Sequence, residues 1–353
     1  MEINTSFWKD RSIFLTGHTG FKGSWIALWL TKMGAKVHGY SLDVEKSPNM
    51  FTEAKLREKL SSSTIADIQN ISTLKSAMSF AKPTVIIHMA AQSLVKKSYE
   101  EPVQTFKTNI IGVVNLLEVA RKVDTVEAII NVTSDKCYES KEYLKPFQEN
   151  DKLGGYDPYS SSKACAELIS SAYRNSFLRE SGIKIATVRA GNVIGGGDWA
   201  INRLIPDFLR ANDNSNKLYI RSPDAIRPWQ HVLNPISGYL MLVEKLVTEG
   251  HNFAEAWNFG PQETDSKSVS WVINYLSQKF SNVQWEIDKA IQHHETSFLL
   301  LDSSKANSKL CWKSRWPLET ALDKIIEWHQ DWKENKAMDE ISISQINSFY
   351  NND

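Results

Sequence analysis

Short apolar runs alternate with segments of helical spacing along most of this chain. An uninterrupted apolar run is typical of a strand that is buried on both faces, and helical segments between such runs form the crossovers of a parallel sheet. The sequence therefore predicts an α/β protein built on a Rossmann-type doubly wound parallel sheet. The predicted strands are 12–16, 36–43, 63–68, 84–92, 128–132 and 184–189, and the predicted helices are 24–33, 105–123, one opening near Tyr159, 201–210 and 318–332.

The length of 353 residues exceeds one typical domain, so we expect two closely associated lobes. Residues 1–189 and about 228–262 are predicted to form a larger, Rossmann-type domain. Residues 190–227 and 263–353 are predicted to form a smaller, mixed α/β C-terminal substrate-binding lobe. Within it, 299–306 reads as a strand running into a helix, and the polar tail after Asn335 is expected to fray.

Three glycines, Gly17, Gly20 and Gly23, follow the first predicted strand and open the first predicted helix. Glycines allow a tight turn and close backbone approach, and a helix N-terminus offers unpaired N–H groups to a pyrophosphate. The spacing is G-x-x-G-x-x-G, so the turn should be one residue longer than in the commonest fingerprint. We predict a dinucleotide site that also includes Thr19, Phe21 and Lys22.

Asp43 lies about 20 residues after the last of these glycines, where a carboxylate binds the adenosine ribose hydroxyls and favours NAD over NADP. The alternative is a loop aspartate that caps the following segment. Lys46 is close enough in sequence to attract a 2′-phosphate instead. Because we expect Asp43 to be fixed at the end of a strand, we predict that it decides in favour of NAD.

Polar or small residues also follow the third and fourth predicted strands. Asp67 and Ile68 end the third strand and are predicted to lie near the adenine. The fourth strand runs into the small residues of 90–92, which let a cofactor approach the backbone. Asn109 lies in the next helix, where it either contacts the cofactor, faces solvent or caps a turn. The predicted contacts from this region are Ala90, Ala91, Gln92 and Asn109.

The strongest chemical signal follows the apolar run 128–132. Ser134, Asp135 and Lys136 place a hydroxyl, a carboxyl and an amine at the carboxyl end of this strand, where open α/β sheets bind ligands. Tyr159 and Lys163 are four residues apart and share one helix face, so an ammonium there is expected to lower the pKa of the phenol and make it a general base. Alone, such a pair more often consists of a packed tyrosine and a solvated lysine.

Composition excludes several classes of partner. Lys+Arg and Asp+Glu both number 41, so the net charge gives no reason to expect nucleic acid or an anionic membrane as partner. No apolar run reaches the roughly 18 residues that span a bilayer, and the start lacks a signal-peptide pattern, so we expect a cytoplasmic protein. The odd, scattered set of Cys137, Cys165 and Cys311 fits reduced thiols. His293, His294 and Glu295 do not predict a metal site, because adjacent histidines point in different directions.

These motifs occur in the order of a known family. The chain resembles the extended short-chain dehydrogenase/reductase family over nearly its whole length, and within it the CDP-glucose 4,6-dehydratases. Lys136 is the most specific residue of this resemblance, because dTDP-glucose dehydratases carry Asp-Glu where this chain has Asp135-Lys136. The matching phrases are residues 17–25, 133–138, 189–199, 227–232 and 257–261.

The resemblance implies a mechanism with NAD as a permanently bound cofactor. Tyr159, activated by Lys163, takes the C4 hydroxyl proton of a sugar nucleotide while a hydride passes from C4 to NAD. Asp135 then acts as the acid and Lys136 as the base in the elimination of water across C5 and C6, and the hydride returns to C6. Ser134 hydrogen-bonds the C4 oxygen. The substrate favoured by the resemblance is CDP-glucose.

The later motifs imply the substrate contacts. Asn192 matches a family position that contacts the diphosphate, and guanidinium groups suit bidentate phosphate recognition. The implied substrate residues are Asn192, Arg203, Arg227 and His231, with His294 and Glu295 as weaker nucleotide contacts.

The resemblance also implies assembly and leaves two alternatives open. The helices at about 102–123 and 159–178 are expected to pair with their symmetry mates in a homodimer or homotetramer. One alternative is a 4-epimerase, or a dehydratase for another nucleotide sugar; an epimerase needs no acid–base pair like Asp135-Lys136. A non-catalytic NAD-binding regulator is the other, but it predicts loss of Tyr159 or Lys163, and both are present.

Overall fold

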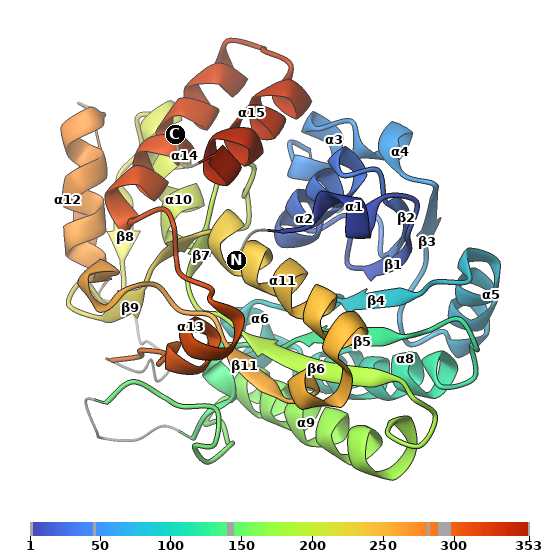
Figure 1. Cartoon of the computed structure of the whole chain (residues 1–353). Helices are drawn as coiled ribbons and strands as arrows, with labels where there is room; N and C mark the ends of the chain where they lie inside the picture. The colour runs from blue at the N-terminus through green and yellow to red at the C-terminus, as the bar shows by residue number, and fades with distance from the viewer. Residues whose placement is uncertain (1–2, 45–46, 140–144, 281–282, 289–297, 352–353) are drawn as a thin grey trace.

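The computed structural model describes residues 3–44, 47–139, 145–280, 283–288 and 298–351. Its central strands are β1 Ser12–Thr16, β2 Lys36–Ser41, β3 Ser62–Ile65, β4 Val85–His88, β5 Ala128–Val132, β6 Lys184–Arg189 and β11 Ala256–Asn258. They form a seven-stranded sheet in the order β11-β6-β5-β4-β1-β2-β3, and neighbouring strands are parallel (Figure 1). The strand order reverses between β1 and β4. The predicted doubly wound parallel sheet is confirmed.

Helices cover both faces of this sheet. Successive residues of a strand point to opposite faces, and in β1 Ile13 and Leu15 join the core on one side while Phe14 joins the core on the other. This two-sided burial explains why the strands are continuous apolar runs. One side is covered by α2 Phe21–Lys32 and α11 Leu233–Glu249, the other by α5 Ile71–Ala81, α8 Gly112–Ala120 and α9 Pro158–Tyr173.

A smaller body with its own core stands beside the sheet. Its elements are α10 Leu204–Asp213, α12 Val269–Lys279, α14 Leu318–Lys333 and the strands β8 Leu218–Ile220, β9 Ile226–Pro228, β12 Ser266–Ser268 and β13 Trp285–Ile287. Phe208, Val272 and Leu322 bring three helices together in this core. β8 pairs with β13 in parallel and β9 with β12 antiparallel, so the body is mixed α/β.

The remaining elements are mostly short. The helices are α1 Thr5–Trp8, α3 Met50–Glu53, α4 Leu56–Lys59, α6 Val95–Glu100, α7 Pro102–Phe106, α13 Ser304–Leu310 and α15 Met338–Asn351, and the strands are β7 Val193–Ile194 and β10 Gln230–His231. The 3₁₀ and π segments are η1 Lys107–Ile111, η2 Asp135–Cys137, η3 Arg174–Leu178, η4 Gly250–Phe253 and η5 Glu263–Asp265. Within the ranges given above, no helix is long and apolar enough to cross a membrane.

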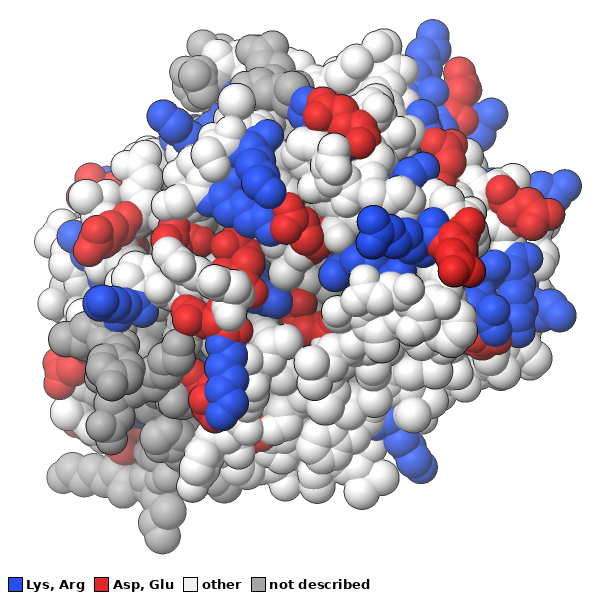
Figure 2. Space-filling view, turned by 60° about the horizontal axis from the view of Figure 1, so that its bottom comes forward, with Lys and Arg blue, Asp and Glu red and all other residues white. Residues whose placement is uncertain are grey.

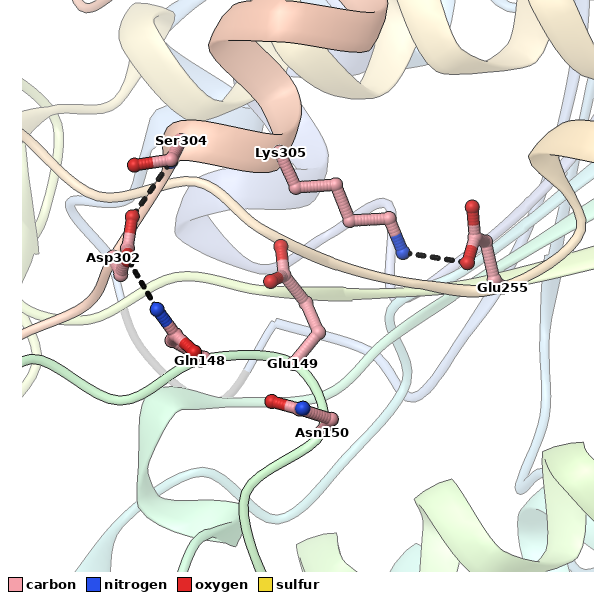
Figure 3. Close-up of a pocket in the computed structure, with 7 residues that line it drawn as sticks. All are labelled: Gln148, Glu149, Asn150, Glu255, Asp302, Ser304 and Lys305. Carbon is pink, nitrogen blue, oxygen red and sulfur yellow. Dashed lines mark hydrogen bonds and ion pairs between the residues drawn. The ribbon is translucent and has the colours of Figure 1, made fainter.

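The free edge of the sheet, at β11, is covered by polar side chains. The Asn258 N–H donates to Glu149 Oε1 at 2.9 Å, and Lys305 Nζ donates to the Ala256 carbonyl at 2.8 Å. Figure 3 shows Lys305 reaching from α13 toward Glu255, with which it pairs at 2.8 Å. These side chains use two of the backbone groups of β11, so this edge of the sheet is partly closed to another chain.

The C-terminal tail differs from the prediction. Instead of fraying, it forms α15, which packs beside α2 (Figure 1). Phe349 is 1% exposed, and its ring lies 5.8 Å from that of Trp29 and 5.2 Å from that of Trp316. Met338, Ile346 and Phe349 form an apolar stripe, but the polar residues between them hide its helical spacing.

Several predicted boundaries also move. β2 ends at Ser41, so Asp43 lies two residues beyond the strand, and β3 ends at Ile65. The helix predicted at 105–123 is three segments, α7, η1 and α8. The strand predicted near 299 is reduced to isolated bridges, one of which joins Phe147 and Leu301.

A buried ion pair ties α9 to the sheet. Glu167 of α9 and Arg189 at the end of β6 are each about 3% exposed at the side chain, and both guanidinium and carboxylate use two atoms, at 2.9 and 2.8 Å. The same carboxylate accepts hydrogen bonds from the hydroxyls of Thr133, just past β5, and Thr187 of β6. Arg189 also donates to the Tyr138 hydroxyl at 2.7 Å. One charged group thus joins two strands, a helix and the segment after β5.

We predict that Glu167→Ala destabilises the fold by about 3–5 kcal/mol, because it leaves the Arg189 guanidinium buried without its counter-charge. Chemical denaturation monitored by circular dichroism measures this change. The control is Glu118→Ala, which removes a carboxylate that pairs with Arg121 at the surface of α8 and should cost about 1 kcal/mol or less. Equal losses in the two variants would contradict the prediction.

Candidate active site

The predicted catalytic residues meet just beyond the carboxyl end of β5. Ser134 caps η2, where its hydroxyl accepts the Lys136 N–H at 3.2 Å. Asp135 in η2 is 3% exposed, and its Oδ1 accepts the Ser134 hydroxyl at 3.0 Å. Lys136 is half-buried. The tight 3₁₀ turn therefore presents a hydroxyl, a carboxyl and an amine within three consecutive residues.

The start of α9 brings the tyrosine and the lysine to the same place. Asp157 caps the helix by accepting the Ser160 N–H at 2.9 Å, and Pro158 occupies the first turn. Tyr159 and Lys163 are 8% and 6% exposed, on the face that packs toward η2. Lys163 Nζ donates to the carbonyl of Val132, the last residue of β5, at 3.2 Å.

The pKa of the phenol differs from the prediction. Burial raises the pKa of Tyr159 to about 12, opposed by a hydrogen bond with Ser134 and by the charge of Arg203, while Asp135 reinforces the rise. Lys163 is not among the main groups that shift this pKa, and its ammonium donates to the Val132 carbonyl. Burial also lowers the pKa of Lys163 to about 8. The sequence shows the partner of a tyrosine but not the depth at which the pair is buried.

The glycine turn has the shape of an anion cradle. Gly17 has φ +75°, and a Cβ there would lie 2.8 Å from the Ala90 nitrogen. A side chain at Gly23 would collide with the Gly17 carbonyl oxygen. Gly20 precedes the twelve-residue helix α2 without any side-chain cap, so its first N–H groups face the turn. These residues fit a dinucleotide pyrophosphate.

Lys22 lies within electrostatic reach of the catalytic residues. Burial lowers its pKa to about 8, and the nearby charges of Arg203 and Lys163 add to this effect while Asp135 opposes it. The glycine motif accounts for its backbone, but nothing in the sequence shows that its ammonium lies among the catalytic groups.

The residues predicted near the adenosine lie in loops. Asp43 is exposed, and its carboxylate accepts the Val44 N–H at 2.9 Å. Asp67 Oδ1 accepts the Gln69 N–H at 2.9 Å, whereas Ile68 is buried against Gly112. Thr19 bonds Ser41 and Leu42 and so holds the glycine turn to the end of β2. Lys46 lies outside the described residues.

Asn109 plays a different part from the predicted cofactor contact. Its Oδ1 accepts the Gln92 N–H at 2.8 Å, and its Nδ2 donates to the Gln92 carbonyl at 3.0 Å and to the Ser162 hydroxyl at 2.8 Å. Both ends of the amide are therefore used by the protein. Asn109, in the π segment η1, fastens the loop of Ala90, Ala91 and Gln92 to α9.

The predicted substrate residues separate into two groups. Arg203 precedes α10 and binds Asp198 at 2.9 Å and the Ser93 hydroxyl at 3.2 Å, so it bridges the smaller body and the loop after β4. Asn192 stands in the loop after β6 with φ +38°. Arg227 lies on β9 and is 4% exposed.

His231 is in the core instead. It is 0% exposed, and its ring lies 6.0 Å from that of Trp25 and 4.8 Å from that of Trp316. Burial lowers its pKa to about 3. The aromatic neighbours that suggested a binding site are packing partners, so we leave His231 out of the substrate site.

A polar link at the switch point was not predicted. His88, at the end of β4, contacts the Thr16 hydroxyl through Nδ1 at 2.7 Å, and the same hydroxyl accepts the Met89 and Ala90 N–H groups. Two polar residues at the carboxyl ends of adjacent strands are the signal that would have found it. His293, His294 and Glu295 lie outside the described residues. Among the residues that the structure describes, no three His, Cys, Asp or Glu side chains are grouped as metal ligands.

Comparison with known sequences gives a consistent result. A model of the family described as GDP-mannose 4,6 dehydratase matches residues 14–325 of this chain. A CDP-glucose 4,6-dehydratase from Salmonella typhimurium is 46% identical over 353 residues, which cover 98% of each chain.

Solved structures share the fold at lower identity. An epimerase from Methanothermobacter thermautotrophicus is 21% identical with a TM-score of 0.81, covering 94% of this chain and 95% of that one. A dTDP-glucose 4,6-dehydratase from Bacillus anthracis, solved in complex with NAD, is 21% identical with a TM-score of 0.75, covering 92% and 98%. These likenesses establish the architecture.

We predict that His88 makes the protein sensitive to acid. Burial lowers the pKa of His88 to about 3, below the 6.5 of an unfolded histidine, so between these values only the unfolded chain takes up the proton. The free energy of unfolding should therefore fall as the pH drops from 6.5, by about 2 kcal/mol at pH 5 from this group.

Urea denaturation at pH 7 and pH 5 measures this loss. His88→Asn, which keeps a polar group near Thr16 but cannot be protonated, should lose about 2 kcal/mol less than the unmodified protein on acidification. Parallel losses in both proteins would show that His88 is not responsible.

Proposed function

This chain belongs to the GDP-mannose 4,6-dehydratase family of the extended short-chain dehydrogenases/reductases, and from its site we propose that it acts as a CDP-glucose 4,6-dehydratase. It is a hydro-lyase that converts CDP-D-glucose to CDP-4-dehydro-6-deoxy-D-glucose. C4 is oxidised, water leaves across C5 and C6, and the hydride returns to C6.

The observation that carries this proposal is the buried Asp135 beside Lys136 and the Tyr159 phenol. Oxidation at C4 needs only the phenol and its hydroxyl partner, as in a 4-epimerase. Elimination also needs an acid for the departing C6 hydroxyl and a base for the C5 proton. Asp135 and Lys136 would supply both within one turn of chain, and the 46% identical relative is named a CDP-glucose 4,6-dehydratase, which supports the same reaction.

NAD fits the cleft at the switch point. The glycine turn would hold its pyrophosphate, Asp43 and Asp67 its adenosine, and the loop 90–92 would lie along its inner half. The chemistry that NAD supplies when bound is reversible hydride exchange, so the cycle is redox-neutral and the cofactor is not consumed. Asp43 disfavours the 2′-phosphate of NADP by like charge, and comparing the dissociation constants of the two cofactors tests this preference.

The protons can be followed on the residues of this chain. Tyr159, beside Lys163, takes the C4 hydroxyl proton, and the C4 ketone then acidifies C5. Lys136 takes the C5 proton and returns it, and Asp135 gives a proton to the departing C6 hydroxyl. Tyr159 has then gained one proton and Asp135 has lost one. Ser134, hydrogen-bonded to both, lies on the path by which the two are restored.

The nucleotide diphosphate would be bound by the smaller body. Arg203 reaches from the start of α10 to Ser93 in the loop after β4, Arg227 lies on β9 of the smaller body, and Asn192 lies in the loop after β6. Guanidinium groups bind phosphates through paired N–H groups. We keep the division into a Rossmann domain of 1–189 and about 228–262 and a substrate lobe of 190–227 and 263–353 as part of this proposal, although α15 returns to α2.

A homodimer or homotetramer is part of the same proposal. Apolar side chains stand exposed along α7, η1, α9 and η3: Val103 65%, Ile111 47%, Leu168 59% and Phe177 47%. Figure 2, which turns the side carrying α9 toward the viewer, shows a broad area without charged residues in its lower half. Such a surface suits pairing with a second copy, and a monomer in sedimentation at micromolar concentration would oppose it. The three free cysteines suit the reducing cytoplasm.

The function is tested by incubating the purified protein and NAD with CDP-glucose, dTDP-glucose and GDP-mannose in separate reactions. We expect the 4-keto-6-deoxy product from CDP-glucose at the highest kcat/KM. If only another nucleotide sugar gave product, that sugar would be the substrate. If the C4 epimer formed without loss of water, the protein would be a 4-epimerase and not a dehydratase.

We predict that Lys136→Ala stops the reaction after C4 oxidation, because the base for the C5 proton is missing. Reduced cofactor should then build up on the enzyme after addition of CDP-glucose, with product formation slowed at least about a hundredfold. Absorbance of bound NADH and product analysis measure the two steps.

The control is Lys152→Ala, which removes a 71% exposed lysine that pairs with Glu139 and should change neither step. Normal product formation by Lys136→Ala would show that another group is the base.

A further inference from the structure

Three buried polar atoms behind Asp135 have no hydrogen-bond partner among the described residues. They are Asp135 Oδ2, Gln230 Oε1 and the Tyr239 hydroxyl, on side chains that are 3%, 1% and 0% exposed. A buried polar group without a partner costs about 1–3 kcal/mol. One such atom on a proposed acid and two more behind it therefore require an explanation.

Shared neighbours place the first two groups together. The carboxyl group of Asp135 rests against Gly191, where any side chain would collide with Oδ2. Gln230 reaches the same residue, because its Nε2 lies 3.4 Å from the Gly191 carbonyl oxygen and donates to the Phe259 carbonyl at 2.7 Å. The amide is thereby anchored at Nε2, which leaves Oε1 as its free end.

Tyr239 approaches from α11 on the sheet face opposite α9. Its ring lies 5.5 Å from that of Phe259, the residue that anchors Gln230. Burial raises the pKa of Tyr239, and the negative charge of Asp135 raises it further, so the phenol is within electrostatic reach of the carboxylate. Tyr239 is buried too deeply to meet substrate or cofactor directly.

The three atoms match the hydrogen-bonding capacity of one water. A water accepts one bond from the Tyr239 hydroxyl and donates one each to Gln230 Oε1 and Asp135 Oδ2, which satisfies all three groups. Buried waters in proteins typically make about three such bonds. We propose that Tyr239 and Gln230 hold one buried water against Asp135 and are positioning residues for this acid.

This inference rests on the proposed function, in which Asp135 protonates the departing C6 hydroxyl. Ser134 holds Oδ1 of the carboxyl group from the front, and the water holds Oδ2 from behind. Because Oδ2 accepts a bond from the water, the proton of the acid is on Oδ1, and a carboxyl group held at both oxygens cannot rotate, so this proton is delivered in one direction. The proton passes from Asp135 to the C6 oxygen, which leaves as water, and the buried water neither gains nor loses a proton.

Tyr239→Phe tests the inference because it removes the hydroxyl and little else. If the hydroxyl were only a packing defect, its loss would leave catalysis unchanged and raise the stability slightly. We expect instead that elimination slows about tenfold while C4 oxidation keeps its rate, so that bound NADH builds up during a single turnover. Because the hydroxyl would lose its bond to the water, the melting temperature should stay the same or fall slightly, whereas removal of a packing defect would raise it.

Two comparisons separate a role at Asp135 from a general effect. Ser314→Ala removes another buried hydroxyl that has no partner within the described part of the chain, and should leave both steps unchanged. In an Asp135→Asn background, Tyr239→Phe should have no further effect on elimination, because the group through which it acts has been replaced.

The inference is overturned if Tyr239→Phe eliminates at the normal rate, slows both steps equally, or has the same effect in the Asp135→Asn background. A high-resolution crystal structure provides a check independent of catalysis: one water should lie within hydrogen-bond distance of the three atoms. Direct bonds from these atoms to other protein groups would overturn it. If the unmodified protein converts no nucleotide sugar at all, the proposed function fails first.

Discussion

The buried carboxylate of Glu167 is the constraint on which the site depends. It lies one turn beyond Lys163 on α9, and its bonds to Arg189, Thr133 and Thr187 fix the height and rotation of that helix against β5 and β6. A helix held only by apolar packing can slide or turn by a fraction of an ångström at little cost, whereas a paired charge allows few arrangements. The helix and the two strands that Glu167 joins therefore fix the positions of the Tyr159 phenol and of the 3₁₀ turn η2.

Polar side chains also fix the loops at the carboxyl ends of the strands. Asn109 fastens the loop after β4 to α9, the Thr16 hydroxyl joins the ends of β1 and β4 through His88, and Arg203 reaches across to Ser93. Each link uses a polar side chain to fix backbone that carries no regular structure. The cleft is thus a ring of loops, each tied to a rigid element by hydrogen bonds.

Sequence patterns predicted much of this and failed for identifiable reasons. β1, β5 and β6 have the predicted bounds, because continuous apolar runs between polar residues leave no ambiguity. α15 was missed because its apolar stripe is diluted by polar residues. His231 was wrongly assigned to the substrate site because the sequence does not distinguish a histidine that packs on tryptophans in the core from one that lines a pocket with them. The raised pKa of Tyr159 was unpredictable because burial is a property of the fold, not of residue spacing.

Lys22 makes the positive charge of the site depend on pH. Its pKa and that of Lys163 are both lowered to about 8, so above that pH the cleft loses two positive charges from its inner wall. Attraction for a doubly charged diphosphate weakens with each loss, whereas a phenol becomes a better base as the medium becomes more alkaline. A rise in pH thus weakens binding of the diphosphate but favours proton abstraction by the phenol. Loss of these charges is therefore expected to weaken binding of the diphosphate at alkaline pH.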